Sequence, residues 1–95
     1  MIKATFTPYS MTIEGHAGAS DGSTYDLVCA AVSATTSMWA NGLTEMNIPV
    51  VQADTDSGYL FVAHDECERY QRVIIKGLRD IEALHPENLK VVIKK

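Results

Sequence analysis

The sequence predicts a two-layer α/β (α+β) sandwich, in which two helices pack against one mixed or antiparallel sheet in the order ββαββαβ. Short apolar segments, several with the alternation of half-buried strands, lie near both ends and in the middle of the chain. Two longer segments have the apolar spacing of helices. A chain of 95 residues can bury one modest core, so we expect a single domain over residues 1–95.

The first two strands are predicted to form a hairpin. From Ile2 to Phe6 apolar residues alternate with polar ones, and the same alternation runs from Met11 to Glu14. Pro8–Ser10 interrupts the pattern and supplies the turn. The second strand should end near Gly15. The small polar residues 17–24 then predict a loop.

The first helix is expected to start at Asp26, whose side chain suits an N-cap. The stretch LVCAAVSATTSMWANGL follows it and has apolar residues on nearly all sides of a helical wheel. We therefore expect a mostly buried helix. Gly42 and Asn47 are candidate stop signals.

The second half of the chain predicts a second hairpin, a second helix and a last strand. Residues 48–53 and 59–63 are the expected strands of the hairpin, and residues 54–58 link them. Apolar residues recur at helical spacing from Cys67 to Leu84, and the His85-Pro86 step ends that helix. Residues 89–93 alternate again and form the last strand, but the pattern does not fix the order of strands in the sheet.

Composition and charge exclude several classes of function. The formal charge is −4 and the pI is about 5.2, and no run of Lys or Arg could follow a nucleic-acid backbone. No segment has the length of a membrane span or a signal peptide, so we expect a cytoplasmic protein with reduced thiols. No metal-ligand set and no phosphate-binding glycine loop is present, so neither a metal nor another cofactor is expected.

Cys29 is the first candidate for chemistry. It follows Asp26 by three residues, which places it in the expected first turn of the helix, where unpaired N–H groups and the helix dipole favour a thiolate. The same N–H groups are also suited to stabilise an oxyanion. The alternative is a small cysteine packed in the core among apolar neighbours.

His16 is the candidate base for that thiol. It lies in the segment Gly15-His16-Ala17-Gly18, between a strand end and a loop, so its ring should be accessible. An accessible imidazole can take a thiol proton and return it to a leaving amine. The alternative is an ordinary surface histidine.

The motif EGHAG, followed by a short loop and YDLVCAAVSA, resembles the signature of the Prp (YsxB-like) family of ribosomal-processing cysteine proteases. The resemblance extends over essentially the whole chain and includes the order of elements. It implies a dyad of Cys29 and His16 in a homodimeric enzyme whose substrate is a large-subunit ribosomal protein precursor with an N-terminal extension. It also implies an apolar pocket for an aromatic residue before the cut. Met38, Trp39 and Met46 are candidates for that pocket, and core packing is the alternative for each.

Asp26, which matches the family's Asp ahead of the cysteine, and two features seen in the residues themselves are candidates for supporting roles. Asp26 either caps the helix or orients His16 as a third member of the site. Ser33 follows Cys29 by one helical turn and either faces the site or bonds back to its own helix. The loop with Gly15, Gly18 and Gly22 is the expected lid.

The loop between the two motifs departs from the family's pattern, because Thr24 stands where a glycine is common and the loop is slightly longer. This departure and the small size of the chain leave two other functions open. One is a non-catalytic module that binds a peptide or an assembling ribosome. The other is the same chemistry directed at a phage capsid or scaffold protein.

Overall fold

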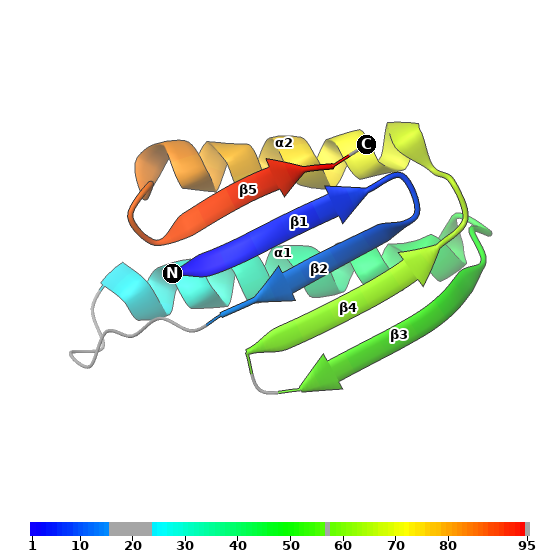
Figure 1. Ribbon diagram of the computed structural model, residues 1–95, viewed down its shortest axis with the longest axis horizontal. Coiled ribbons are helices and arrows are strands. Elements are labelled where there is room, and N and C mark those ends of the chain that lie inside the picture. The colour runs from blue at the N-terminus through cyan, green and yellow to red at the C-terminus, as the bar shows by residue number, and fades with distance from the viewer. Residues whose placement is uncertain (16–23, 57, 95) are drawn as a thin grey trace.

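A five-stranded mixed sheet with two helices on one of its faces makes up the fold (Figure 1). The computed structural model describes residues 1–15, 24–56 and 58–94. The elements follow the order ββαββαβ, which confirms the predicted two-layer sandwich. They are β1 (Ile2–Thr7), β2 (Ser10–Glu14), α1 (Thr24–Glu45), β3 (Val50–Asp56), β4 (Tyr59–His64), α2 (Glu68–Leu84) and β5 (Leu89–Ile93).

The sheet has the strand order β3-β4-β2-β1-β5, which local sequence patterns did not predict. The pairs β1–β2, β2–β4 and β3–β4 are antiparallel, and β1–β5 is parallel. β3 and β5 are therefore the two edges. The end of β2, the start of β1 and the β3–β4 turn lie at one end of the sheet (Figure 1).

The hydrophobic core lies between the sheet and the two helices. Alternation in the strands buries one face, as predicted for the first hairpin. From the strands it contains Ile2, Ala4, Phe6, Met11, Ile13, Val62, Leu89 and Val91, and from the helices Val28, Val32, Trp39, Leu43, Ile74 and Leu78.

The prediction that α1 is mostly buried is wrong. Its buried stripe includes Val28, Val32 and Leu43, whereas Leu27 and Met38 are about three-quarters exposed, at 73% and 71%. In a two-layer fold the outer face of a helix has no layer above it, whatever its composition. Neither helix in the described ranges combines the length and apolar character needed to cross a membrane.

Asn47 ends α1, as expected, and Gly42 does not. Asn47 has a positive φ of 57°, and the amide of Ile48 donates to the Leu43 carbonyl at 2.9 Å, the pattern of a Schellman motif. Gly42 lies inside the helix instead. A Cβ there would overlap the hydroxyl oxygen of Tyr70, so glycine permits the close packing of α2.

The third strand lies two to three residues later than predicted. The Schellman motif occupies Ile48 and Pro49 follows it without an amide to donate, so β3 begins at Val50. It continues to Asp56, because residues 54–56 pair with β4 and do not form a link. The predicted second helix and last strand are confirmed, and the amide of His85 donates to Ile81 at the helix end.

Candidate active site

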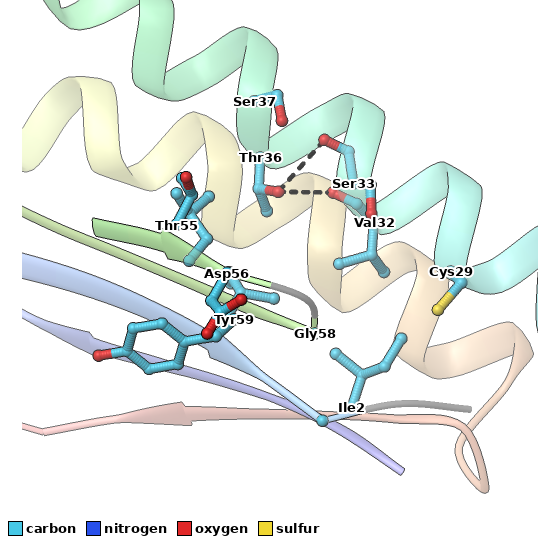
Figure 2. Close-up of a pocket in the computed structure, with 13 residues that line it drawn as sticks. Ile2, Cys29, Val32, Ser33, Thr36, Ser37, Thr55, Asp56, Gly58 and Tyr59 are labelled. Carbon is cyan, nitrogen blue, oxygen red and sulfur yellow. Dashed lines mark hydrogen bonds between the residues drawn. The ribbon is translucent and has the colours of Figure 1, made fainter. Parts of the chain in front are cut away.

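A cavity of about 290 Å³ lies between α1 and the end of the sheet where β1 begins (Figure 2). Cys29 and Ser33 line it from α1, and Gly15 lines it from the end of β2. The other lining residues are Ile2, Ile13, Val32, Thr36, Ser37, Thr55, Asp56, Gly58, Tyr59 and Leu60. Three of the residues singled out in the sequence thus meet at one cavity.

The Cys29 thiol is accessible from this cavity. It is a free cysteine of intermediate exposure, and one side of it packs against the core. Figure 2 shows its sulfur directed from α1 towards the side of the cavity formed by Ile2. Cys29 thus both packs against the core and lines the cavity.

Cys29 lies one turn further into α1 than the sequence predicted. The helix begins at Thr24, two residues before Asp26, so Asp26 belongs to the first turn and is not the cap. In a regular helix only the first four amides lack a partner, and the amide of Cys29 pairs with the carbonyl of residue 25. The prediction that this thiol lies among free amides is wrong. The side chain of Asp26 lies outside the described residues.

Gly15 brings the chain to the cavity immediately before His16. Its φ of +110° suits glycine, and a Cβ at this position would overlap the carbonyl oxygen of Met1. Its amide donates to the carbonyl of Gly58 at 3.0 Å, which ties the end of β2 to the β3–β4 turn. His16, Gly18 and Gly22 themselves lie outside the described residues.

Hydroxyl groups of α1 line the cavity beside Cys29. Thr36 is buried, and its Oγ1 donates to the carbonyl of Val32 at 2.8 Å, as Figure 2 shows. Ser33 is exposed and lies one turn after Cys29 on the same wall. Asp56 is the one charged residue among the described residues of the lining.

The three residues considered for an aromatic pocket do not line this cavity. Trp39 is 2% exposed and belongs to the core, as the alternative predicted, and its Nε1 donates to the Tyr70 carbonyl at 2.8 Å. Met38 and Met46 are 71% and 57% exposed, so neither is a core residue. Apolar contact in the cavity comes from Ile2, Ile13, Val32 and Leu60 instead.

A second cysteine–histidine pair lies elsewhere, between β4 and α2. The sulfur of Cys67 is 3.4 Å from Nδ1 of His64. That nitrogen is also 2.7 Å from the carbonyl oxygen of Asp65, and since a carbonyl only accepts, Nδ1 carries the hydrogen. It therefore has no lone pair for a thiol proton. Sequence reasoning missed this contact, although a spacing of three residues was visible.

The surroundings of the Cys67 thiol disfavour its ionisation. Burial raises the pKa of Cys67 above its ordinary value, which disfavours the thiolate. Nε2 of His64 is buried and has no hydrogen-bond partner among the described residues. Within the same ranges, no group of three or more His, Cys, Asp or Glu side chains could hold a metal ion.

The fold places a free thiol at a cavity, as a cysteine peptidase requires. The family model for the cysteine protease Prp matches residues 1–90. The chain belongs to this family and is a cysteine-type endopeptidase. No match was found among curated proteins.

Solved structures share the fold. The ribosomal processing protease Prp from S. aureus in complex with a covalently linked product peptide has a TM-score of 0.83 at 21% identity, over 99% of this chain and 100% of that chain. The same protease with a substrate peptide has a TM-score of 0.85 at 18% identity and the same coverage. SMU.848 from Streptococcus mutans has a TM-score of 0.80 at 27% identity, over 98% and 93% of the two chains.

Proposed function

We propose that this chain is a site-specific endopeptidase that removes the N-terminal extension of a bacterial large-subunit ribosomal protein, with Cys29 as nucleophile and His16 as base. One observation carries the dyad: Cys29 and Gly15, the residue before His16, line the same cavity. Family membership and the fold shared with the S. aureus ribosomal processing protease support the substrate.

The proposed reaction has two stages. His16 takes the proton of the Cys29 thiol, and the thiolate attacks the carbonyl carbon of the scissile peptide bond. The tetrahedral intermediate collapses when His16 donates that proton to the leaving amine, which leaves a thioester on Cys29. Water, deprotonated by His16, then attacks the thioester carbonyl carbon. The C–S bond breaks, the Cys29 thiolate takes the proton back from His16, and the new carboxylate is released.

The corrected helix start changes which group activates the thiol. The effect of a helix dipole falls off within the first turn, and Cys29 lies in the second. Activation therefore depends mainly on His16. Ser33, one turn on and exposed to the cavity, is a supporting donor for the oxyanion, and Asp26 is a supporting residue that orients His16.

We also propose that the protein is a homodimer and that the loop containing His16 is a lid. The family resemblance supports a cytoplasmic homodimer built from one domain over residues 1–95. The segment containing Gly15, Gly18 and Gly22 acts as a lid, which excludes water when substrate is bound. Sedimentation of the purified protein should give twice the monomer mass, and a monomer would reject the dimer.

Two peptides test the client protein. One spans the N-terminal extension of the large-subunit ribosomal protein with an aromatic residue before the cut, and the other spans the processing site of a phage capsid protein. Mass spectrometry should locate one cut, after the aromatic residue of the ribosomal peptide. Cleavage of the capsid peptide alone would reject the ribosomal assignment. Cleavage by the Cys29→Ala protein would reject the nucleophile.

A further inference from the structure

A row of side chains leads away from Cys29 along α1, on the wall of the cavity (Figure 2). Cys29, Ser33 and Ser37 follow one another at intervals of four residues, and all three line the cavity. Side chains at this spacing are neighbours on one face of a helix. The cavity therefore continues past the proposed nucleophile for about two turns of α1. The proposed reaction uses Cys29 and Ser33 and leaves Ser37 without a role.

The two serine hydroxyls on this wall are open to a bound molecule. Ser33 and Ser37 are exposed, and neither hydroxyl has a hydrogen-bond partner among the residues that the structure describes. Thr36, which lies between them in the sequence, differs because its Oγ1 donates to the Val32 carbonyl at 2.8 Å. A hydroxyl inside a helix often bonds back to its own backbone in this way. The hydroxyls of the two serines remain available instead.

The sheet supplies the floor of the cavity beside this row. Leu60 of β4 pairs with Ile13 of β2 and with Thr55 of β3, and all three line the cavity. Register partners in a sheet carry their side chains on the same face, and Ile13 is buried on the face that the helices cover. Thr55 is exposed on that face, so the cavity is open to solvent on the β3 side.

The spacing of the row matches that of an extended peptide. Ser33, the proposed oxyanion donor, and Ser37 are one helical turn apart, which is about 6 Å along the axis. An extended chain advances about 6.6 Å in two residues, and its carbonyl groups at alternate residues point to the same side. A substrate whose scissile carbonyl lies at Ser33 therefore presents the carbonyl two residues away to Ser37.

The chemistry of the row fits a peptide backbone. A serine hydroxyl donates to a carbonyl oxygen and carries no charge. Asp56 is the one charged residue among the described residues of the lining, and it lies on the sheet side of the cavity, at the end of β3. Nothing in the row selects a charged side chain, whereas its hydroxyls suit the main-chain groups that every peptide carries.

We infer that the substrate lies extended along α1, above the floor formed by Leu60 and Thr55, and that Ser37 donates a hydrogen bond to the substrate carbonyl two residues from the scissile one. The inference rests on the proposed function, because Cys29 and Ser33 fix where the scissile carbonyl lies. The contact at Ser37 is remote from the reacting atoms. It therefore contributes equally to binding of the substrate and of the transition state, and its loss raises KM without changing kcat.

Ser37→Ala tests the contact, because it removes the hydroxyl and leaves a good helix former at an exposed position. With a ribosomal peptide that extends well beyond the cut on both sides, we expect KM to rise about threefold to tenfold, while kcat and the rate of Cys29 alkylation stay within about twofold. Ser37→Thr keeps a hydroxyl and should retain the parent KM. Thr44→Ala is the matched control, since Thr44 is exposed on α1 outside the cavity. An unchanged KM in Ser37→Ala would overturn the inference.

Shorter peptides test which carbonyl Ser37 contacts. One peptide starts, with a free amine, at the residue before the aromatic residue, and the other ends at the residue after it. Each thus lacks the second carbonyl on one side of the scissile one. Ser37→Ala should lower kcat/KM for one of these peptides as much as for the long peptide, and should have no effect on the other, because the chain follows α1 in one direction only. Any other pattern contradicts a contact at that carbonyl.

Binding to the Cys29→Ala protein separates this inference from the proposed function. Fluorescence anisotropy of the labelled long peptide gives Kd without cleavage. Adding Ser37→Ala should raise Kd by the same factor of about three to ten, and an equal Kd would refute the contact. A parent protein that binds the peptide without cleaving it contradicts the proposed function alone, and one that does not bind it contradicts both.

Discussion

The two cysteines occupy opposite surroundings in this small fold. Both are partly buried and pack against the core. Cys29 lines a cavity, and Gly15, which precedes the expected base His16 in the sequence, lines the same cavity. Cys67 already touches a histidine, but the Nδ1 hydrogen of His64 is donated to a carbonyl. A contact between sulfur and imidazole therefore does not by itself identify a nucleophile. The thiol must also be accessible, and the imidazole nitrogen facing it must have a free lone pair to take its proton.

The Cys67 neighbourhood is organised for packing. Trp39 stacks on Tyr70 with ring centroids 5.0 Å apart, and each side chain donates to the backbone carbonyl of the other residue. His64 lies edge-on to Trp39 at 5.5 Å. Trp39 and Cys29 are ten positions apart on α1, or about 15 Å along the helix axis. The end of α1 around Trp39 is thus packed against α2, and we refer to it as the packed end. The end around Cys29 opens on a cavity.

Exchange of each cysteine for alanine gives the largest expected difference. Cys29→Ala should lower kcat/KM for the ribosomal peptide by at least about 10³-fold, since no other group forms the thioester. Cys67→Ala should leave kcat/KM within about threefold. Both proteins are compared at equal folded concentration by circular dichroism. Equal losses in the two variants would contradict the comparison.

Substitution at Gly42 should affect the packed end alone. The Cβ of Gly42→Ala overlaps the Tyr70 hydroxyl, so we expect a loss of about 1–2 kcal/mol in the free energy of unfolding, measured with urea. Alanine normally stabilises a helix by about 1 kcal/mol relative to glycine. The sign of the change in the free energy of unfolding therefore distinguishes the overlap with Tyr70 from ordinary helix propensity. Adding Tyr70→Phe removes the overlapping oxygen and should recover part of the loss. A more stable Gly42→Ala protein would show that this contact is not tight.

Alkaline pH should weaken the packed end. Burial raises the pKa of Cys67, and burial followed by the charge of Cys67 raises the pKa of Tyr70. Both groups are thus more acidic in the unfolded chain, so their contribution is complete below the unfolded values and is lost as pH rises through the folded ones. Thermal unfolding should show stability falling above about pH 9. Cys67→Ser should reduce that fall, and an identical pH dependence would refute this assignment.

Charge next to Cys67 should have the smallest effect. Glu68 and Arg72 form an exposed ion pair at 3.4 Å, a kind of contact that contributes little in water. Glu68→Gln should change the free energy of unfolding by less than about 0.5 kcal/mol and leave cleavage unchanged. A larger loss of stability would mean that this pair supports the start of α2.

Local sequence patterns predicted the elements well and their arrangement poorly. Alternation identified the first hairpin and the last strand, because it reflects burial of one sheet face. The strand order depends on pairing between distant segments, which no local pattern encodes. Strand β3 was misplaced because Asp54 and Asp56 are typical of turns, whereas at an exposed sheet edge they are tolerated within a strand.

For the site, too, the sequence indicated candidate residues better than it indicated their surroundings. The position of Cys29 at a cavity agrees with its proposed role, but the free-amide argument failed because α1 begins at Thr24. Helix ends are poorly defined by sequence, since neighbouring polar residues compete as caps. Met38 and Trp39 point to opposite sides of α1, one to solvent and one to the core, so neither lines the cavity at Cys29. For Trp39, core packing was the stated alternative.

The pH dependence of Cys29 alkylation tests the dyad most directly. The measurement uses the Cys67→Ser protein with and without His16→Ala, so that only one thiol reacts with iodoacetamide. With an activated dyad, the thiol reacts below neutral pH, and loss of His16 moves this reactivity to the range of a free thiol, about pH 8.5. If both proteins react with the same profile, His16 does not activate Cys29 and the proposed mechanism is wrong.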